Sequence, residues 1–199
     1  MRRGAVLGAV AAGLVATVAH AQPLAPSPDQ IRAAYTEASA DWRPVPPLVR
    51  TAFVLAEDKN FWTRSPSLST LTRTVTQIAT KGGGALGQVV VVGQTLHRDE
   101  IADWFVNDVF LGQSCYGVQG AAQAYFGKDV AGLSLAEAAL LATLPVDPHA
   151  IKTRPDRAKT RRDKIIDDLL EARIVSLADA VAAKAAPLGL SEPLGVCSL

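Results

Sequence analysis

The stretch that decides the fold of this chain is VPPLVRTAFVLAEDKNFW, residues Val45–Trp62. Its apolar residues recur at the spacing of one helix face, and these are Leu48, Ala52, Phe53, Leu55 and Ala56. The apolar run ends abruptly in Glu57 and Asp58, which are followed closely by Phe61 and Trp62. Carboxylates that border apolar surface are costly unless they are solvated, paired or functional. The stretch therefore predicts a buried helix that delivers two carboxylates to a loop.

Helix start and stop signals recur on both sides of this stretch. Ser27-Pro28-Asp29-Gln30 combines an N-cap serine, a proline at the first helical position and a glutamine at N3, and it opens a helix to about Ser39. Only Val89–Val92 resembles a strand. No internal repeat or linker divides the chain, so we expect one mainly α domain. Further helices are expected over Ser69–Thr80, Asp99–Leu111, Tyr116–Phe126, from Ser134 to before Pro145, over Pro155–Arg173 and from Ser176.

The N-terminus has the pattern of a secretory signal peptide over residues 1–21. Arg2 and Arg3 precede the uncharged apolar run Ala5–Val18, and Ala19-His20-Ala21 forms a small-x-small cleavage site before Gln22. With cleavage there, we expect the chain to be exported to a bacterial periplasm. The alternative is an uncleaved anchor that would leave the protein associated with the inner membrane, although the run is short for a spanning helix.

Composition narrows the class of partner. The formal net charge of +1 gives no reason to expect nucleic acid or an acidic polymer. The two cysteines, Cys115 and Cys197, form no CxxC motif or Cys/His cluster, so we assign no metal ligand. In an oxidising compartment they form either a disulfide that ties the tail to the core or two separate thiols, and the sequence leaves both open.

The motifs then carry a family resemblance. VPPLVRTAFVLAEDKNFW resembles the first motif of the family 51 glycosyltransferases, the peptidoglycan polymerases of bifunctional penicillin-binding proteins and monofunctional transglycosylases. A longer match starts at Arg98 and ends at Arg173. It holds, in the order of the family, Asn107, Gly112, Tyr116-Gly117, Tyr125-Phe126-Gly127-Lys128 and Glu137. The resemblance implies a lysozyme-like helical transglycosylase domain over residues 44–186, with a leader and helix over 22–43 and an irregular tail over 187–199.

The family reaction implies roles for individual residues. These enzymes polymerise lipid II into glycan strands, with a lipid pyrophosphate as the leaving group. By resemblance, Glu57 is the catalytic general base that takes the proton of the acceptor hydroxyl. Asp58, Phe61, Gln88 and Asn107 are implied to bind substrate. The implied partners are lipid II or nascent peptidoglycan, with a membrane surface reached through the lipid, and the implied cofactor is a divalent cation, Mg²⁺ or Mn²⁺. The sequence indicates no protein partner.

The chain also departs from the family pattern. Arg64 and Pro66 stand where the family has a histidine and a glycine after the first motif. The second motif, Gly-Gly-Ser-Thr-Ile-Thr-Gln-Gln, has its best counterpart in Gly82–Val89, which keeps the glycines and Gln88 and no hydroxyl. The third motif, a helix with a basic pair and a second glutamate, has no counterpart between Gln88 and Arg98. The function is therefore either weak polymerisation, non-catalytic binding of glycan or lipid II by a degenerate homologue, or an unrelated role on the same scaffold.

Several of these residues also have a purely structural interpretation. Asn107 is expected to cap or cross-link helices, and Glu137 belongs to a capping box that starts at Ser134. Tyr116, Tyr125 and Phe126 are expected in the core. The arginines near the start of the last long helix are expected on its solvated face, with phosphate binding as the alternative, and they are Arg154, Arg157, Arg161 and Arg162.

Overall fold

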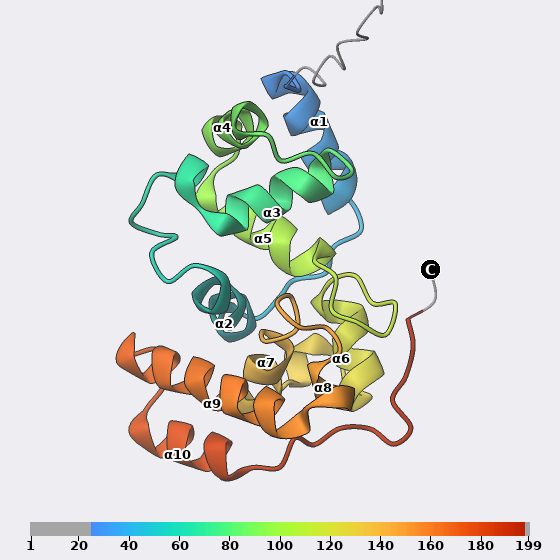
Figure 1. Ribbon diagram of the computed structural model, residues 1–199, viewed down its shortest axis with the longest axis vertical. Coiled ribbons are helices and arrows are strands. Elements are labelled where there is room, and N and C mark those ends of the chain that lie inside the picture. Colours follow the sequence, from blue (N-terminus) through green and yellow to red (C-terminus); the bar gives the residue numbers. More distant parts are fainter. Residues whose placement is uncertain (1–24, 198–199) are drawn as a thin grey trace, which may run out of the picture.

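The computed structural model describes residues 25–197 (Figure 1), so the predicted signal peptide, residues 1–21, lies outside the described residues. This part of the chain forms ten α-helices and two 3₁₀ turns. In chain order they are α1 (Pro28–Ser39), α2 (Pro47–Glu57), η1 (Pro66–Leu68), α3 (Thr70–Ala79), α4 (Leu86–Thr95), α5 (Arg98–Asp108), α6 (Val118–Phe126), η2 (Val130–Gly132), α7 (Leu135–Leu141), α8 (Ala150–Thr153), α9 (Pro155–Glu171) and α10 (Leu177–Ala185).

The expected mainly α architecture is confirmed and is in keeping with a lysozyme-like helical domain, since residues 25–197 contain no strand. Most predicted helices begin and end close to the expected residues. The capping boxes at Ser27 and Ser134 are both formed, and Glu137 closes the second by accepting the N–H of Ser134 at 2.8 Å. Within the same range of residues, no helix has the length and apolar character needed to cross a bilayer.

The strand expected at Val89–Val92 is wrong, because these residues lie within α4. Val89 and Val92 are buried three positions apart, which is a helical rather than an alternating pattern. Gly93 lets this helix approach η1, since a Cβ there would lie 2.8 Å from the backbone nitrogen of Ser67. A helix therefore occupies the place where the sequence analysis expected one to be missing.

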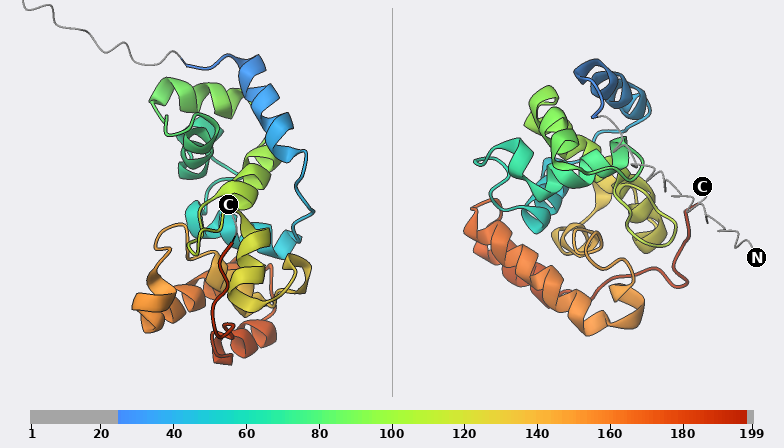
Figure 2. Two further views of the ribbon diagram at one scale, coloured as in Figure 1. Left: turned by 90° about the vertical axis from the view of Figure 1, so that its right-hand side faces the viewer. Right: turned by 45° about the horizontal axis from the view of Figure 1, so that its top comes forward.

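The helices form two halves with α2 between them (Figures 1 and 2). Helices α1, α3, α4 and α5 make up one half, and α6 to α10 make up the other. Helix α2 contacts α3 and α5 on one side and α7 and α9 on the other. Its residues Ala52, Phe53 and Val54 are fully buried, and Phe53 meets Phe105 of α5 edge to face at 6.4 Å. Of the predicted apolar face, Ala52 and Phe53 are therefore in the core, whereas Leu48, Leu55 and Ala56 are only partly buried against it. The packing of α2 sets where Glu57 emerges.

The expectation that Arg162 lies on the solvated face of α9 is wrong, because its side chain is fully buried. Its guanidinium donates to the carbonyl oxygens of Lys184, Ala186 and Pro187, at the end of α10 and the start of the tail. Asp163 balances its charge at 2.7 Å. A buried arginine needs both a counter-charge and acceptors, and the chain end supplies the acceptors.

The irregular tail is fastened to α6 and ends in a disulfide. The backbone N–H groups of Ser191 and Gly195 donate to the carbonyl oxygens of Tyr125 and Ala124, at 2.8 and 2.7 Å. Cys197 is bonded to Cys115, which settles the two alternatives in favour of the disulfide. Gly120 makes room for this bond, since a Cβ there would lie 2.7 Å from the Sγ of Cys197.

Candidate functional site

Glu57 is the last residue of α2, and the backbone turns out of the helix at Asp58. The carboxyl is half-buried beside the first turn of α3, where the hydroxyl of Thr70 donates to the backbone carbonyl of Glu57 at 3.1 Å. Burial raises the pKa of Glu57, and the nearby charge of Asp58 adds to the rise, while the Thr70 side chain opposes it. The position therefore gives a carboxylate a higher proton affinity than it has in water.

Glu57 opens onto a hollow of about 260 Å³ between α2 and α9, which we name the Glu57 hollow. Three cationic side chains line it with Glu57: Lys59 from the loop after α2, and Arg161 and Lys164 from α9. Arg161 also lies 3.7 Å from Asp147. The carboxylate of Glu57, which has reduced solvation, therefore shares a small cavity with three cations.

Asp168 holds two of these cations. Lys59 and Lys164 both donate hydrogen bonds to its Oδ1, and the carboxylate itself is buried. Burial raises the pKa of Asp168, but the hydrogen bonds from Lys164 and Lys59 outweigh it and the net shift is downward. The sequence analysis missed all three residues. Lys59 lies two positions after Glu57, and the packing of α9 against α2 brings Lys164 and Asp168 to it.

Two of the predicted substrate-binding residues face the protein rather than the Glu57 hollow. Asp58 is buried, its Oδ1 accepts the N–H of Asn60 at 3.0 Å, and its Oδ2 lies 3.6 Å from Arg64. Arg64, which replaces the histidine of the family pattern, therefore acts as a partner for Asp58. Phe61 is fully buried and packs edge to face on Trp62 at 4.9 Å.

Gln88 and Asn107 do not line the Glu57 hollow either. Gln88 is buried at the start of α4, where its side-chain oxygen accepts the N–H groups of Gly84 and Ala85 at 2.8 and 3.1 Å. The Asn107 amide donates to the carbonyl of Asp103 within α5 at 2.9 Å. The structure therefore brings none of the four predicted substrate-binding side chains into the Glu57 hollow.

A second hollow lies beyond the turn formed by residues 142–148, and we name it the aromatic hollow. It has a volume of about 320 Å³, and its lining includes Thr74 and Gln77 of α3, Asp108, Phe110, Tyr116 and Pro145. The same turn supplies Ala142, Thr143 and Val146 to the Glu57 hollow. The same turn thus contributes to both hollows, and α3 runs from Thr70 beside Glu57 to Gln77 in the aromatic hollow.

Helix α3 carries a segment that the sequence analysis overlooked. Thr74-Val75-Thr76-Gln77 matches the Thr-Ile-Thr-Gln of the family's second motif more closely than Gly82–Val89 does, with valine in place of isoleucine. Thr74 and Gln77 line the aromatic hollow, and the hydroxyl of Thr76 donates to the Thr72 carbonyl at 2.8 Å. The tetrapeptide precedes Gly82–Gly84, whereas the motif places it after the glycines, so Gly82–Val89 stays the predicted counterpart.

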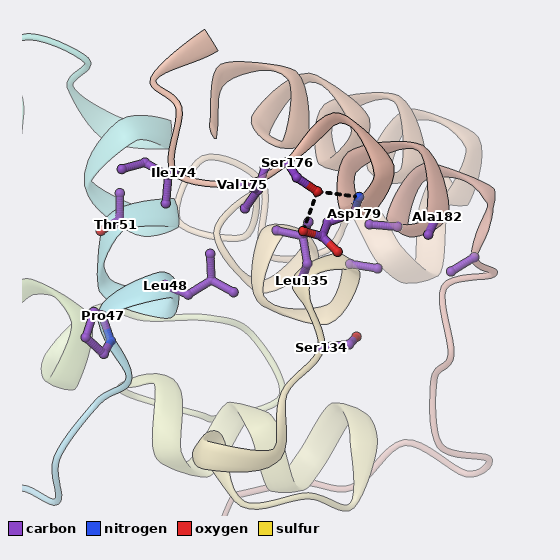
Figure 3. Close-up of a pocket in the computed structure, with 13 residues that line it drawn as sticks. Pro47, Leu48, Thr51, Ser134, Leu135, Ile174, Val175, Ser176, Asp179 and Ala182 are labelled. Atoms are coloured by element: carbon purple, nitrogen blue, oxygen red, sulfur yellow. Dashed lines mark hydrogen bonds between the residues drawn. The ribbon is translucent and has the colours of Figure 1, made fainter. Parts of the chain in front are cut away.

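A third hollow, of about 760 Å³, lies elsewhere (Figure 3). It is lined by Pro47, Leu48 and Thr51 of α2, by the start of α7 and by α10, so it adjoins the opposite end of α2 from Glu57. Its one carboxylate, Asp179, accepts a hydrogen bond from Ser176 at 2.6 Å as part of the α10 cap. This hollow therefore brings together no groups suited to glycosyl transfer.

The side chains around Glu57 do not form a cage for a divalent cation. Asp58 is turned toward Arg64, and Asp168 is occupied by two lysines. Across residues 25–197, no group of three or more histidine, cysteine, aspartate or glutamate side chains is placed to hold a metal. The divalent cation stays a prediction from the resemblance, and no step below passes through it.

Comparisons with known proteins identify the domain. The sequence model of the family described as Transglycosylase matches residues 86–170. Penicillin-binding protein 1A of Neisseria lactamica is 44% identical over 88 residues, which are 43% of this chain and 11% of that protein. Penicillin-binding protein 1A of Neisseria gonorrhoeae is 32% identical over 163 residues, which are 66% of this chain and 20% of that protein. The chain thus spans a fifth or less of the length of these relatives.

Among solved structures, the crystal structure of penicillin-binding protein 1A from Haemophilus influenzae is similar to this chain. It is 26% identical with a TM-score of 0.49, and the similarity covers 74% of this chain and 17% of that chain.

Proposed function

The chain carries a transglycosylase domain, and we propose that this domain is a peptidoglycan glycosyltransferase with Glu57 as its general base. The substrate would be lipid II, joined to a growing glycan strand. The observation that carries the proposal is the half-buried carboxyl of Glu57, which opens onto a cavity lined by three cationic side chains.

Glycosyl transfer to a sugar hydroxyl is favoured by a base with raised proton affinity. A sugar hydroxyl is a poor nucleophile at neutral pH, so a carboxylate that takes its proton as the new bond forms lowers the barrier. The hydroxyl oxygen attacks the anomeric carbon of the donor, the bond from that carbon to the pyrophosphate oxygen breaks, and the proton passes to Glu57. The raised pKa of Glu57, caused mainly by burial, supports this role because it strengthens the base.

The leaving pyrophosphate needs positive charge. Arg161 is the best candidate in the Glu57 hollow, because its ion pair with Asp147 is long at 3.7 Å. Lys59 and Lys164 are less available, since both donate to Asp168. We therefore expect slower turnover than in a site whose cations all face the substrate.

The pairing of Lys59 and Lys164 with Asp168 favours a second candidate function. If Asp168 neutralises the lysines fully, the domain would bind lipid II or glycan strands as an accessory envelope protein without joining them. The two functions differ in one measurable property, because only the first consumes lipid II.

Export across the cytoplasmic membrane is part of the proposal. The Cys115–Cys197 disulfide supports it, because such bonds persist in the periplasm and are rare in the bacterial cytoplasm. There the protein would meet lipid II at the outer face of the inner membrane.

A lipid II polymerisation assay on the purified full chain tests the proposal. We expect glycan product from the parent and a loss of about 10²–10⁴-fold in rate for Glu57→Gln. Glu37→Gln, on the exposed face of α1, is the matched control and should retain the parental rate. No product from the parent, together with saturable binding of lipid II, would favour the accessory function. No product and no binding would reject both.

A further inference from the structure

The disulfide joins two sulfurs that differ in their access from solvent. Cys115 is fully buried between α5 and α6, whereas Cys197 is half-buried at the end of the tail, which runs from α10 along α6 (Figures 1 and 2). A hollow of about 440 Å³, which we name the tail hollow, borders Cys197 and does not have Cys115 in its lining. It is lined by Gly120, Gln123, Ala124, Gly195, Val196 and Cys197. A reagent that enters the tail hollow from solvent therefore meets Cys197 first.

The lining of the tail hollow is small next to the sulfur. A Cβ at Gly120 would lie 2.7 Å from the Sγ of Cys197, so the glycine leaves space that any side chain would fill. The larger lining side chains, Gln123 and Val196, are both exposed rather than packed into the protein. Access to the attacked sulfur is one of the properties that set the rate of thiol–disulfide exchange.

Cys115 lies in a short hairpin, residues 109–117, that is not anchored by its aromatic side chains. Phe110 and Tyr116 form a β-bridge across it. The expectation that Tyr116 lies in the core is wrong, because its side chain is 61% exposed, and Phe110 is 36% exposed. Tyr125 and Phe126, in α6, are buried as expected. The hairpin therefore depends on its backbone contacts and on the disulfide.

The end of the tail fastens the tip of this hairpin. Gln113 and Ser114 have φ of 52° and 59°, a left-handed region that non-glycine residues avoid. The backbone N–H of Cys197 donates to the carbonyl of Gln113 at 3.0 Å, next to the disulfide. Val196 is 68% exposed, so burial of apolar surface contributes little to holding the last residues. Opening of the disulfide would therefore release the end of the tail and a hairpin tip whose conformation its own residues disfavour.

We propose that the Cys115–Cys197 bond is a thiol–disulfide exchange site, which a protein that presents two neighbouring cysteine thiols opens through the tail hollow. One thiolate of this dithiol attacks the Sγ of Cys197, the S–S bond breaks, and Cys115 leaves as a thiolate with the bonding electron pair. The second thiolate attacks the mixed disulfide, so Cys197 is released and the partner closes its own disulfide.

The exchange balances in electrons and protons. The dithiol is oxidised by two electrons, the protein disulfide is reduced by the same two, and the two thiol protons of the dithiol end on Cys115 and Cys197. The Sγ of Cys115 lies 3.4 Å from the carbonyl oxygen of Gln113, which can accept the S–H of the reduced cysteine.

Exchange at this site would reach the Glu57 hollow through the backbone. Gly112 of the hairpin packs against the turn formed by residues 142–148, since a Cβ there would lie 2.6 Å from the carbonyl oxygen of Pro148. The same turn lines the Glu57 hollow. We therefore expect reduction to lower the rate of polymerisation, and this expectation alone rests on the proposed function.

Thiol titration of the folded full chain tests the exchange site. With glutathione as a monothiol probe, we expect a mixed disulfide at Cys197 and a free thiol at Cys115, located by peptide mass spectrometry after an acid quench. With dithiothreitol we expect reduction of both cysteines while circular dichroism shows a folded protein. Hydrogen exchange in residues 109–117 should become faster after reduction.

A change of charge at Gln123 tests the tail hollow as the entry route. Gln123→Glu should slow the attack of the dithiothreitol thiolate by about threefold, because like charges repel over short distances in screened solvent. Gln94→Glu, the same change at an exposed position on α4, is the matched control and should react at the parental rate. Equal rates in the two variants would reject this route.

Three further results would overturn the exchange site: no reduction of the folded parent by dithiothreitol, a mixed disulfide at Cys115, or unchanged hydrogen exchange in the hairpin after reduction. Polymerisation is measured separately on the oxidised and the reduced parent. The double variant Cys115→Ser and Cys197→Ser should behave like the reduced parent with or without dithiothreitol. Equal rates in the oxidised and reduced parent would remove the effect on the Glu57 hollow. Exchange at Cys197 in a protein that never polymerises would leave the site standing and reject the proposed enzyme.

Discussion

Lys59, two residues after Glu57, donates a hydrogen bond to Asp168, which lies 109 positions further along the chain on α9. This contact closes the Glu57 hollow on one side and joins the loop after α2 to the C-terminal half of the protein. It also means that a cation beside Glu57 is already paired. If Glu57 acts as proposed, its reactivity depends on Asp168, a side chain that forms no part of the first motif.

The pH dependence of catalysis should show the raised pKa of Glu57. The general base must be ionised, so the rate is expected to rise with pH through a pKa above the ordinary glutamate value. Initial rates of lipid II polymerisation measured from acidic to neutral pH would show this limb. A limb at or below the ordinary glutamate pKa would contradict the assignment of Glu57 as the base.

The raised pKa of Glu57 affects stability in the opposite sense to the lowered pKa of a carboxylate in a salt bridge. Because the folded state holds the proton of Glu57 more tightly than the unfolded chain, stability falls as the pH rises from the ordinary glutamate pKa through the raised one. Glu57→Gln should therefore leave the free energy of unfolding at neutral pH unchanged or slightly increased. Urea unfolding of both proteins at several pH values measures it, and a large loss of stability in the variant would show that Glu57 is structural.

Asp168 should contribute stability that is lost in acid. Its pKa is lowered, so its contribution is fully present above the ordinary aspartate pKa and disappears as the pH falls through the value in the folded protein. Asp168→Asn should be less stable than the parent at neutral pH, and the difference should shrink on acidification. Asp41→Asn, at an exposed position, is the control and should show no such trend in urea unfolding. A difference that is constant with pH would contradict the ion-pair role.

Arg162 should be the most important arginine for stability. Arg162→Ala removes three hydrogen bonds to backbone carbonyls at the end of α10 and leaves Asp163 without its closest cation. We expect a loss of about 3 kcal/mol in the free energy of unfolding. Arg157→Ala, on the exposed face of the same helix, should change it by less than about 0.5 kcal/mol. Equal effects of the two variants would show that the buried contacts are worth little.

Reduction of the disulfide should lower stability without abolishing the fold. Cys115 and Cys197 are 82 positions apart, so the bond restricts a long loop in the unfolded chain. Its loss is expected to cost about 2–4 kcal/mol. Urea unfolding with and without a thiol reductant measures this cost. The double variant Cys115→Ser and Cys197→Ser is the reference, because a reductant cannot affect it. An unchanged midpoint on reduction would show that the tail is held by its other contacts.

Local sequence patterns predicted most of the helices, because helix formation depends on spacing and end signals within a few residues. The capping boxes at Ser27 and Ser134 show this. The pattern failed at Val89–Val92, where a short valine run suits a strand or a helix equally well. Packing of Val89 and Val92 on one buried face decided between them.

The candidate site was predictable only in part. The apolar stripe of α2 places Glu57 at a helix end next to core, and any fold that buries this stripe does the same. What surrounds the carboxyl depends on contacts over long sequence separations. Lys59 and Asp168 meet because α9 packs on α2, whereas Gln88 and Asn107 satisfy local backbone groups away from the Glu57 hollow.

The sequence by itself determined that this is a helical chain with two carboxylates at the end of an apolar helix, because both properties follow from local periodicity. The tertiary structure decided that Arg162 is buried, that Tyr116 is exposed and that Cys115 pairs with Cys197. Each of these outcomes depends on which distant segment supplies a backbone acceptor, a covering surface or a second sulfur. Such partners are fixed only when segments that are distant in sequence pack together.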